Sequence, residues 1–282
     1  MIEAIFQFEF LRNTFIVGII IGFIAPLIGA FIVVKRLSLI ADALSHVTLS
    51  GIAASLFLSK KTLLFAGLNP LYMGIGFSVV GSVMIERLRR VYKHYEELAI
   101  PIILSSGMGI GVIFISLADG FNTELTNYLF GSVSAVSRVD VVLIAIIAVI
   151  VVATIALLFK ELFLISFDEE HATASGVPAK VIHFLFMVLV ALVISASIRI
   201  VGILLVSSLM TLPVAAGMRI ATGFKQTILY SIIFGEISII GGLISAYYLD
   251  IQPGGTIVVI SIIILLSTVG FQKVKIKRGE SK

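Results

Sequence analysis

Long apolar stretches with almost no charged residues fill most of this 282-residue chain, and short polar segments separate them. Stretches near twenty residues long match a helix that crosses the hydrocarbon core of a bilayer. Only Arg199 separates the sixth of these stretches from the seventh, so eight spans is the alternative to nine. The pattern predicts an all-α, polytopic transmembrane helical bundle that forms a single domain over residues 1–282. The nine expected spans are 14–34, 39–58, 62–85, 98–117, 141–159, 181–198, 201–218, 228–249 and 256–269.

Composition agrees with a membrane protein. Hydrophobic residues make up 59% of the chain and charged residues only 13%, and the mean hydropathy is +1.18. A soluble domain of this size does not need so much apolar surface. There are no cysteines, which excludes disulfides and thiolate metal sites. The surplus of lysine and arginine is expected to mark cytoplasmic loops in contact with lipid headgroups, and no nucleic-acid partner is expected.

The distribution of basic residues predicts the orientation. If the loop after the first span is inside, fifteen of the 20 lysines and arginines lie inside and five lie outside. Inner loops of membrane proteins carry the excess of positive charge. The N-terminus is therefore expected outside and the C-terminus in the cytoplasm. The five outer residues are Arg12, Lys60, Lys61, Arg138 and Arg199, and the last four could pair with acidic groups on an extracellular partner or be solvated.

Very few ionisable residues fall inside the predicted spans. Among 16 acidic residues and four histidines, only Asp42, Glu236 and His46 lie within spans, whereas His183 lies at the start of one. Asp42 and His46 are four positions apart, so a helix places them on one face, roughly 5–6 Å apart. A charge near the bilayer centre costs at least about 2.5–3.5 kcal/mol unless it meets a partner or a polar cavity. Two such groups on one face indicate a shared ligand or a water-filled path, and a local Asp–His hydrogen bond is the alternative.

A carboxylate and an imidazole are ligands for a divalent transition metal. One Asp and one His supply only two of the roughly four ligands that Zn²⁺ takes. Two copies of the chain around a two-fold axis would supply Asp₂His₂. Mixed nitrogen and oxygen ligands suit Zn²⁺ and also Mn²⁺ or Fe²⁺. Hydropathy places Asp42 only a few residues from the inner end of its span.

The segment after the fifth span, residues 160–180, carries Asp168, Glu169, Glu170 and His171 before small residues and a Gly-Val-Pro stop. Acidic residues at its start favour a short helix, because they complement the helix dipole. The sequence allows either a short amphipathic helix or an ordinary polar loop here.

Several motifs in order resemble the permease subunits of bacterial zinc/manganese ABC importers. They are RLSLIADALSHVTLSGIA, NYLFGSVSAVSRVD, FDEEHATASGVP, SIRIVGILLVSSLMTLPVAAGMRI and SAYYLDIQPGGTIVV. The resemblance implies a fold like that of type II ABC importers and a homodimer in the bacterial plasma membrane. It also implies two cytoplasmic ATP-binding cassette subunits and an extracellular metal-binding protein. It implies that Asp42 and His46 are metal ligands in the translocation path. Ala41 is a departure, since members often have Gly before the Asp.

The resemblance also assigns a role to the segment after the fifth span. It matches the cytoplasmic element that docks on the ATPase through Phe167, Asp168, Glu169, Glu170, His171, Ala172 and Gly176. The chain lacks the G-x-x-x-x-G-K-[ST] nucleotide loop, so ATP hydrolysis is expected on a separate subunit and no enzyme activity or bound cofactor is expected in this chain.

Three interpretations of the chain remain. The first is an ABC importer permease for zinc, with manganese or iron as the alternative ion. The second is a stand-alone, proton-coupled metal transporter. The third, an intramembrane metalloprotease, lacks the H-E-x-x-H motif. Glu236 either lines the path or forms a hydrogen bond between helices.

Overall fold

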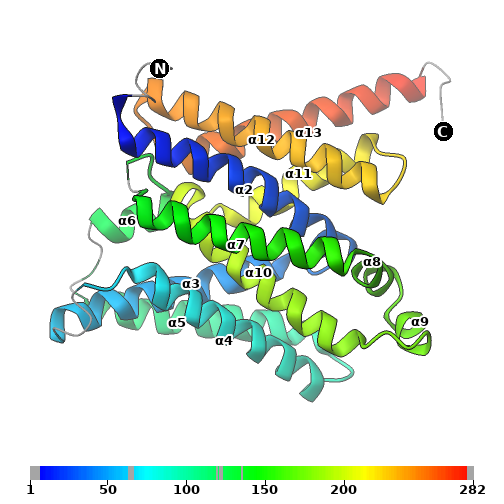
Figure 1. Cartoon of the computed structure of the whole chain (residues 1–282), viewed down its shortest axis with the longest axis horizontal. Helices are drawn as coiled ribbons and strands as arrows, with labels where there is room; N and C mark the ends of the chain where they lie inside the picture. The colour runs from blue at the N-terminus through cyan, green and yellow to red at the C-terminus, as the bar shows by residue number, and fades with distance from the viewer. Residues whose placement is uncertain (1–6, 63–66, 119, 121–122, 135, 278–282) are drawn as a thin grey trace.

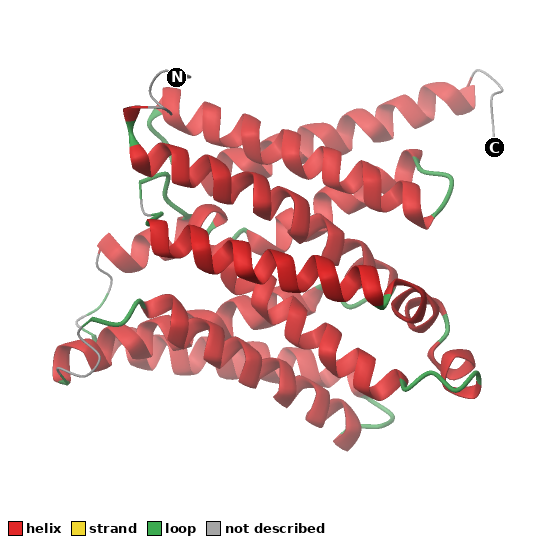
Figure 2. Cartoon of the chain, in the orientation of Figure 1, coloured by secondary structure: helices red, strands yellow, loops and turns green. Residues whose placement is uncertain are grey.

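The computed structural model describes residues 7–62, 67–118, 120, 123–134 and 136–277. This part of the chain is all-α and contains no strand (Figure 2), so the predicted fold class is confirmed. Short turns connect most of the helices. The elements are α2 (Glu9–Val34), α3 (Leu39–Lys61), α4 (Pro70–Val91), the 3-10 helix η1 (Glu96–Leu98), α5 (Ala99–Leu117), α6 (Thr123–Phe130), α7 (Arg138–Leu157), α8 (Phe159–Phe167), α9 (Glu169–Ala174), α10 (Ala179–Val201), α11 (Val206–Ile220), α12 (Phe224–Leu249) and α13 (Pro253–Lys277).

Eight helices in the described residues are long and apolar enough to cross a membrane, and α11 is a shorter apolar helix. With 15 residues, α11 is about 22 Å long, less than the roughly 30 Å hydrocarbon core. It nevertheless runs between the two ends of the bundle, as the seventh predicted span requires (Figure 1). The two ends of the chain consequently lie at opposite ends of the bundle. The end that holds α8 and α9 is called the α9 end below, and the opposite end, which holds α6, is called the α6 end.

Two helix boundaries differ from the sequence prediction. The third span begins at Pro70 rather than at residue 62, because Asn69 caps the helix by accepting a hydrogen bond from the Leu71 amide (3.1 Å) and proline suits a first helical position. Residues 63–66 lie outside the described residues. The break between the sixth and seventh spans falls at Gly202, not at Arg199. Gly202 has φ +84°, and a Cβ there would lie 2.5 Å from the carbonyl oxygen of Leu129, so only glycine fits this turn.

The helices form two groups, and α10 joins them. Helix α3 packs against α4 and α5, while α2 packs against α12 and α11, and α13 lies against α11 and α12. Helix α10 contacts both groups (Figure 1). Close approach depends on small residues, as is usual in membranes: a Cβ on Gly29 would meet the Met210 carbonyl oxygen at 2.0 Å. Helices α2, α3 and α10 are the most buried spans.

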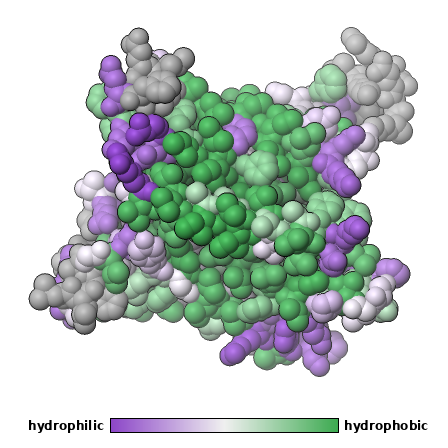
Figure 3. All heavy atoms as spheres, viewed as in Figure 1, coloured by the Kyte–Doolittle hydropathy of each residue, from purple (hydrophilic) through white to green (hydrophobic). Residues whose placement is uncertain are grey.

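On the face that Figure 3 shows, apolar side chains cover most of the middle, and most polar side chains gather toward the two ends. This band has the pattern of a bilayer-embedded surface, in which only the ends of the helices meet water.

Candidate functional site

Asp42 and His46 lie in the first two turns of α3, near the α9 end. Both are partly exposed and share a face with Leu39, which is 59% exposed. Their neighbours on α3, such as Ala43 and Leu44, are fully buried. The two ionisable side chains therefore point away from the chain's own core.

Neither side chain has a hydrogen-bond partner among the described residues, and no hydrogen bond joins the two. The serine hydroxyl groups near them donate hydrogen bonds to backbone carbonyls instead. Ser45 donates to Ala41 (2.7 Å), and Ser50 donates to Gly107 on α5 (2.7 Å). The carboxylate and the imidazole are thus left available for an external ligand.

Helix α5 fixes the position of this part of α3. A Cβ on Gly107 would lie 2.9 Å from the amide nitrogen of Val47 and 3.2 Å from the carbonyl carbon of His46. Glycine therefore lets the two backbones touch beside the candidate ligands. Within the described residues, no group of three or more His, Cys, Asp or Glu side chains could hold a metal ion. Asp42 and His46 therefore stay a predicted pair of ligands, and among the described residues of one copy no third such side chain joins them.

The segment after α7 forms two short helices, α8 and α9, and not the ordinary polar loop that the sequence also allowed. Asp168 caps α9 by accepting a hydrogen bond from the His171 amide (2.8 Å). Glu169, Glu170 and His171 are exposed, whereas Ala172 is fully buried. Gly176 ends the segment with φ +84°, a conformation that favours glycine.

Exposed aromatic rings flank this segment. Phe167 is 60% exposed, and its ring lies 4.8 Å from that of Phe163 and 5.8 Å from that of Phe224. An exposed apolar cluster beside a charged short helix is typical of an interaction surface.

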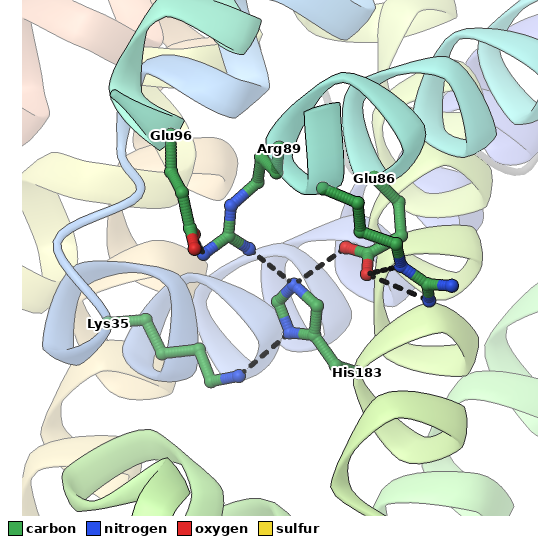
Figure 4. A network of polar contacts seen from close by, with 6 residues as sticks. Lys35, Glu86, Arg89, Glu96 and His183 are labelled. Carbon is green, nitrogen blue, oxygen red and sulfur yellow. Dashed lines mark hydrogen bonds and ion pairs between the residues drawn. The ribbon is translucent and has the colours of Figure 1, made fainter. Parts of the chain in front are cut away.

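A polar network also ties the helices together at the α9 end (Figure 4). His183, buried at the start of α10, lies 2.9 Å from the Lys35 amine and 2.7 Å from the Arg89 guanidinium. Arg89 also pairs with Glu96 (2.6 Å). Burial lowers the pKa of Lys35 to about 8, against the opposing effect of the Glu169 carboxylate on α9. The network therefore connects α2, α4 and α10 next to α9. Sequence reasoning missed it, because residues 35, 89 and 183 are far apart along the chain.

At the α6 end, Arg199 does not face an outside partner. Its guanidinium lies 3.4 Å from the fully buried carboxylate of Asp140 and donates to Asn69 (2.9 Å), which in turn donates to Asp140 (2.8 Å). Arg138 pairs with Glu9 (2.8 Å), and Lys60 donates to the Ala118 carbonyl (2.7 Å). These three cations therefore bind groups of the same chain.

Glu236 is not brought together with Asp42 and His46. It lies in the middle of α12, against Gly22 of α2, in a groove whose other wall is α7. Helix α3 packs against α4, α5, α10 and α11 instead.

Comparisons with known proteins agree with this architecture. The ABC 3 transport family matches residues 7–272. A "Probable metal transport system membrane protein" of Treponema pallidum is 33% identical over 95% of this chain and 97% of its own. The "Manganese import system permease protein ScaB" of Streptococcus parasanguinis is 34% identical over 94% of this chain and 91% of its own.

A solved structure extends the similarity to the whole fold. A chain of "PsaBC from Streptococcus pneumoniae in complex with Fab" superposes with a TM-score of 0.81, at 30% identity over 95% of this chain and 93% of that one. The family match covers most of the described bundle, including α3, α9 and α12. This chain therefore belongs to the ABC 3 transport family and is the membrane permease of a metal importer of the ABC class.

Proposed function

We propose that the permease passes a divalent transition metal through a site built from Asp42 and His46 of two copies of the chain. The observation that supports this proposal is that Asp42 and His46 lie on the partly exposed face of α3 and have no hydrogen-bond partner among the described residues. Two ligands from each copy complete a set of four around a two-fold axis, which is the common symmetry of homodimers. This ligand set contains no thiolate and no third carboxylate, so it is expected to hold the metal ion loosely enough to release it.

Manganese is the ion to test first. The relative from S. parasanguinis is named for manganese import, whereas the sequence motifs had suggested zinc. Carboxylate and imidazole ligands accept both ions, and the affinity order alone favours Zn²⁺ over Mn²⁺. Zinc is therefore the second candidate, and iron the third.

The α9 end is the side proposed to face the cytoplasm. Its capped helix α9, the buried anchor Ala172 and the exposed ring of Phe167 form a surface on which a separate ATP-hydrolysing subunit would dock. The excess of basic residues at this end supports the orientation. The α6 end would then receive the ion from an extracellular metal-binding protein, and the membrane would be the plasma membrane.

The test is uptake by the permease reconstituted in vesicles with its ATPase and delivery protein. Asp42→Asn and His46→Gln are expected to abolish ATP-dependent uptake while the assembled complex is still recovered. Ser45→Ala, on the buried face of the same helix turn, is the matched control and should transport normally. Normal transport by both ligand variants would exclude this site.

A further inference from the structure

Glu236 occupies an apolar groove in the middle of the membrane-spanning region. The groove has a volume of about 540 Å³ and lies between α2, α7 and α12. Its walls include Ile20 and Phe23 on α2 and Val149 and Val152 on α7, and Glu236 is the acidic residue among the lining side chains. This carboxyl group therefore faces hydrocarbon on several sides.

Nothing in the described part of the chain compensates a negative charge there. Among the described residues, Glu236 has no ion-pair or hydrogen-bond partner. An unpaired charge inside a bilayer is costly, and an acid so placed usually takes up a proton instead. The apolar walls thus favour the neutral, proton-bearing form.

Helix α2 presents a backbone group that needs a donor at the same place. Pro26 lies inside α2 and has no amide hydrogen, so the carbonyl of Gly22 one turn earlier loses its usual helical partner. That carbonyl points toward α12, because its oxygen would lie 2.8 Å from a Cβ built on Gly235. In membranes, carbonyls freed by proline are satisfied by groups on neighbouring helices.

Glycine at position 22 makes room for the carboxyl group. A Cβ there would lie 2.9 Å from the carboxyl carbon of Glu236 and 3.0 and 3.1 Å from its two oxygens. The side chain therefore rests on the backbone of α2 at the residue whose carbonyl is left without its donor.

We propose that Glu236 is a proton-binding site: its carboxyl group carries a proton and donates it in a hydrogen bond to the proline-freed carbonyl of Gly22. The bond joins α12 to α2 inside the bilayer. In this role Glu236 is a positioning residue and not a metal ligand, and the assignment is independent of the Asp42–His46 site.

The first test is modification by the hydrophobic reagent dicyclohexylcarbodiimide in the intact permease. A protonated carboxyl adds across one C=N bond of the reagent, and the resulting O-acylisourea rearranges to a stable N-acylurea with no change in oxidation state. Peptide mass spectrometry at neutral pH should find Glu236 modified. Glu86, which is buried and paired with Arg90 and His183, is the internal control and should stay unmodified. An unmodified Glu236 in the folded protein, together with modification after denaturation, would overturn the proposal.

The second test separates a proton donor from a buried charge. Glu236→Gln keeps a hydrogen-bond donor and should melt at the wild-type temperature. Glu236→Leu removes the donor and should melt at a lower temperature, although leucine suits the lipid better. If Glu236 were charged, both substitutions would relieve the buried charge and raise the melting temperature, and that result would contradict the proposal.

Discussion

The candidate ligands are visible in the sequence because ionisable residues are so scarce in the spans. Asp42 and His46 stand out at a helical spacing of four, and the structure places both on the partly exposed face of α3. Contacts between residues that are far apart in the sequence cannot be predicted in this way. Asn69 lies 130 positions from Arg199, and no local pattern indicates that they meet. Arg199 therefore looked available to a partner from the sequence, although it pairs with the buried carboxylate of Asp140.

Asp42 should be dispensable for folding but required for metal binding. Asp42→Asn keeps the shape of the side chain, and the carboxylate has no partner within the described residues to lose. The variant should therefore melt within a few degrees of the wild type, yet show no saturable metal binding by equilibrium dialysis. A melting temperature that fell sharply would indicate a structural role for Asp42 instead.

Lys35 should make stability depend on alkaline pH. Burial lowers its pKa in the folded state to about 8, from the ordinary value of 10.5. Between these values the unfolded chain binds more protons than the folded chain, so stability rises with pH. We expect the melting temperature of the wild type, relative to Lys35→Met, to increase as the pH rises from 8 toward 10.5.

The control for that comparison is Lys180→Met, at an exposed lysine at the start of α10. An equal pH dependence in the wild type and in Lys35→Met would show that Lys35 does not carry the effect.

At the scale of elements, most spans follow from hydropathy, whereas their boundaries follow from local chemistry. The start of α3 matches the prediction at residue 39. The start of α4 is later because of the Asn69–Pro70 cap, and the break before α11 depends on the positive φ of Gly202. Hydropathy does not report either feature. The short helix α6 was also missed, since it lies in a polar connection.

The contact between α3 and α5 should be sensitive to one added methyl group. Gly107→Ala would press against the backbone of Val47, and such overpacking costs about 1–3 kcal/mol. We expect a lower melting temperature and weaker metal binding, because the strain falls next to His46.

Gly109 on the same helix is the matched control. A Cβ there meets no atom within 4 Å, so Gly109→Ala should be neutral or stabilise α5 by up to about 1 kcal/mol through helix propensity. Equal effects of the two substitutions would contradict a specific α3–α5 contact.

The α9 cap should control association with the ATPase. Asp168→Ala removes the side-chain acceptor of the His171 amide, which costs about 1 kcal/mol of local helix stability. We expect roughly fivefold weaker binding of the ATPase in a pull-down titration. Asp168→Asn, which can still cap, should bind normally; equal loss in both variants would point to the charge rather than to the cap.

At the scale of the whole molecule, the two ends of the bundle differ in a way that suits directional transport. The α9 end combines the Lys35–His183–Arg89 network with an exposed short helix, whereas the α6 end holds the Arg199–Asp140 pair, whose carboxylate is fully buried. Asp42 is the fourth residue of α3, so the candidate site lies about 5 Å along the helix from its first residue. An ion entering from the α6 end would have to travel most of the length of α3 before it met the site.

The most direct measurement is ATP-dependent uptake of Mn²⁺ and Zn²⁺, at matched free concentrations, by vesicles that contain the permease, its ATPase and the delivery protein. The account predicts uptake that requires ATP, favours Mn²⁺ and is lost in Asp42→Asn but kept in Ser45→Ala. Uptake that proceeds without ATP, or that survives in Asp42→Asn, would contradict the proposed Asp–His site in an ATP-driven importer.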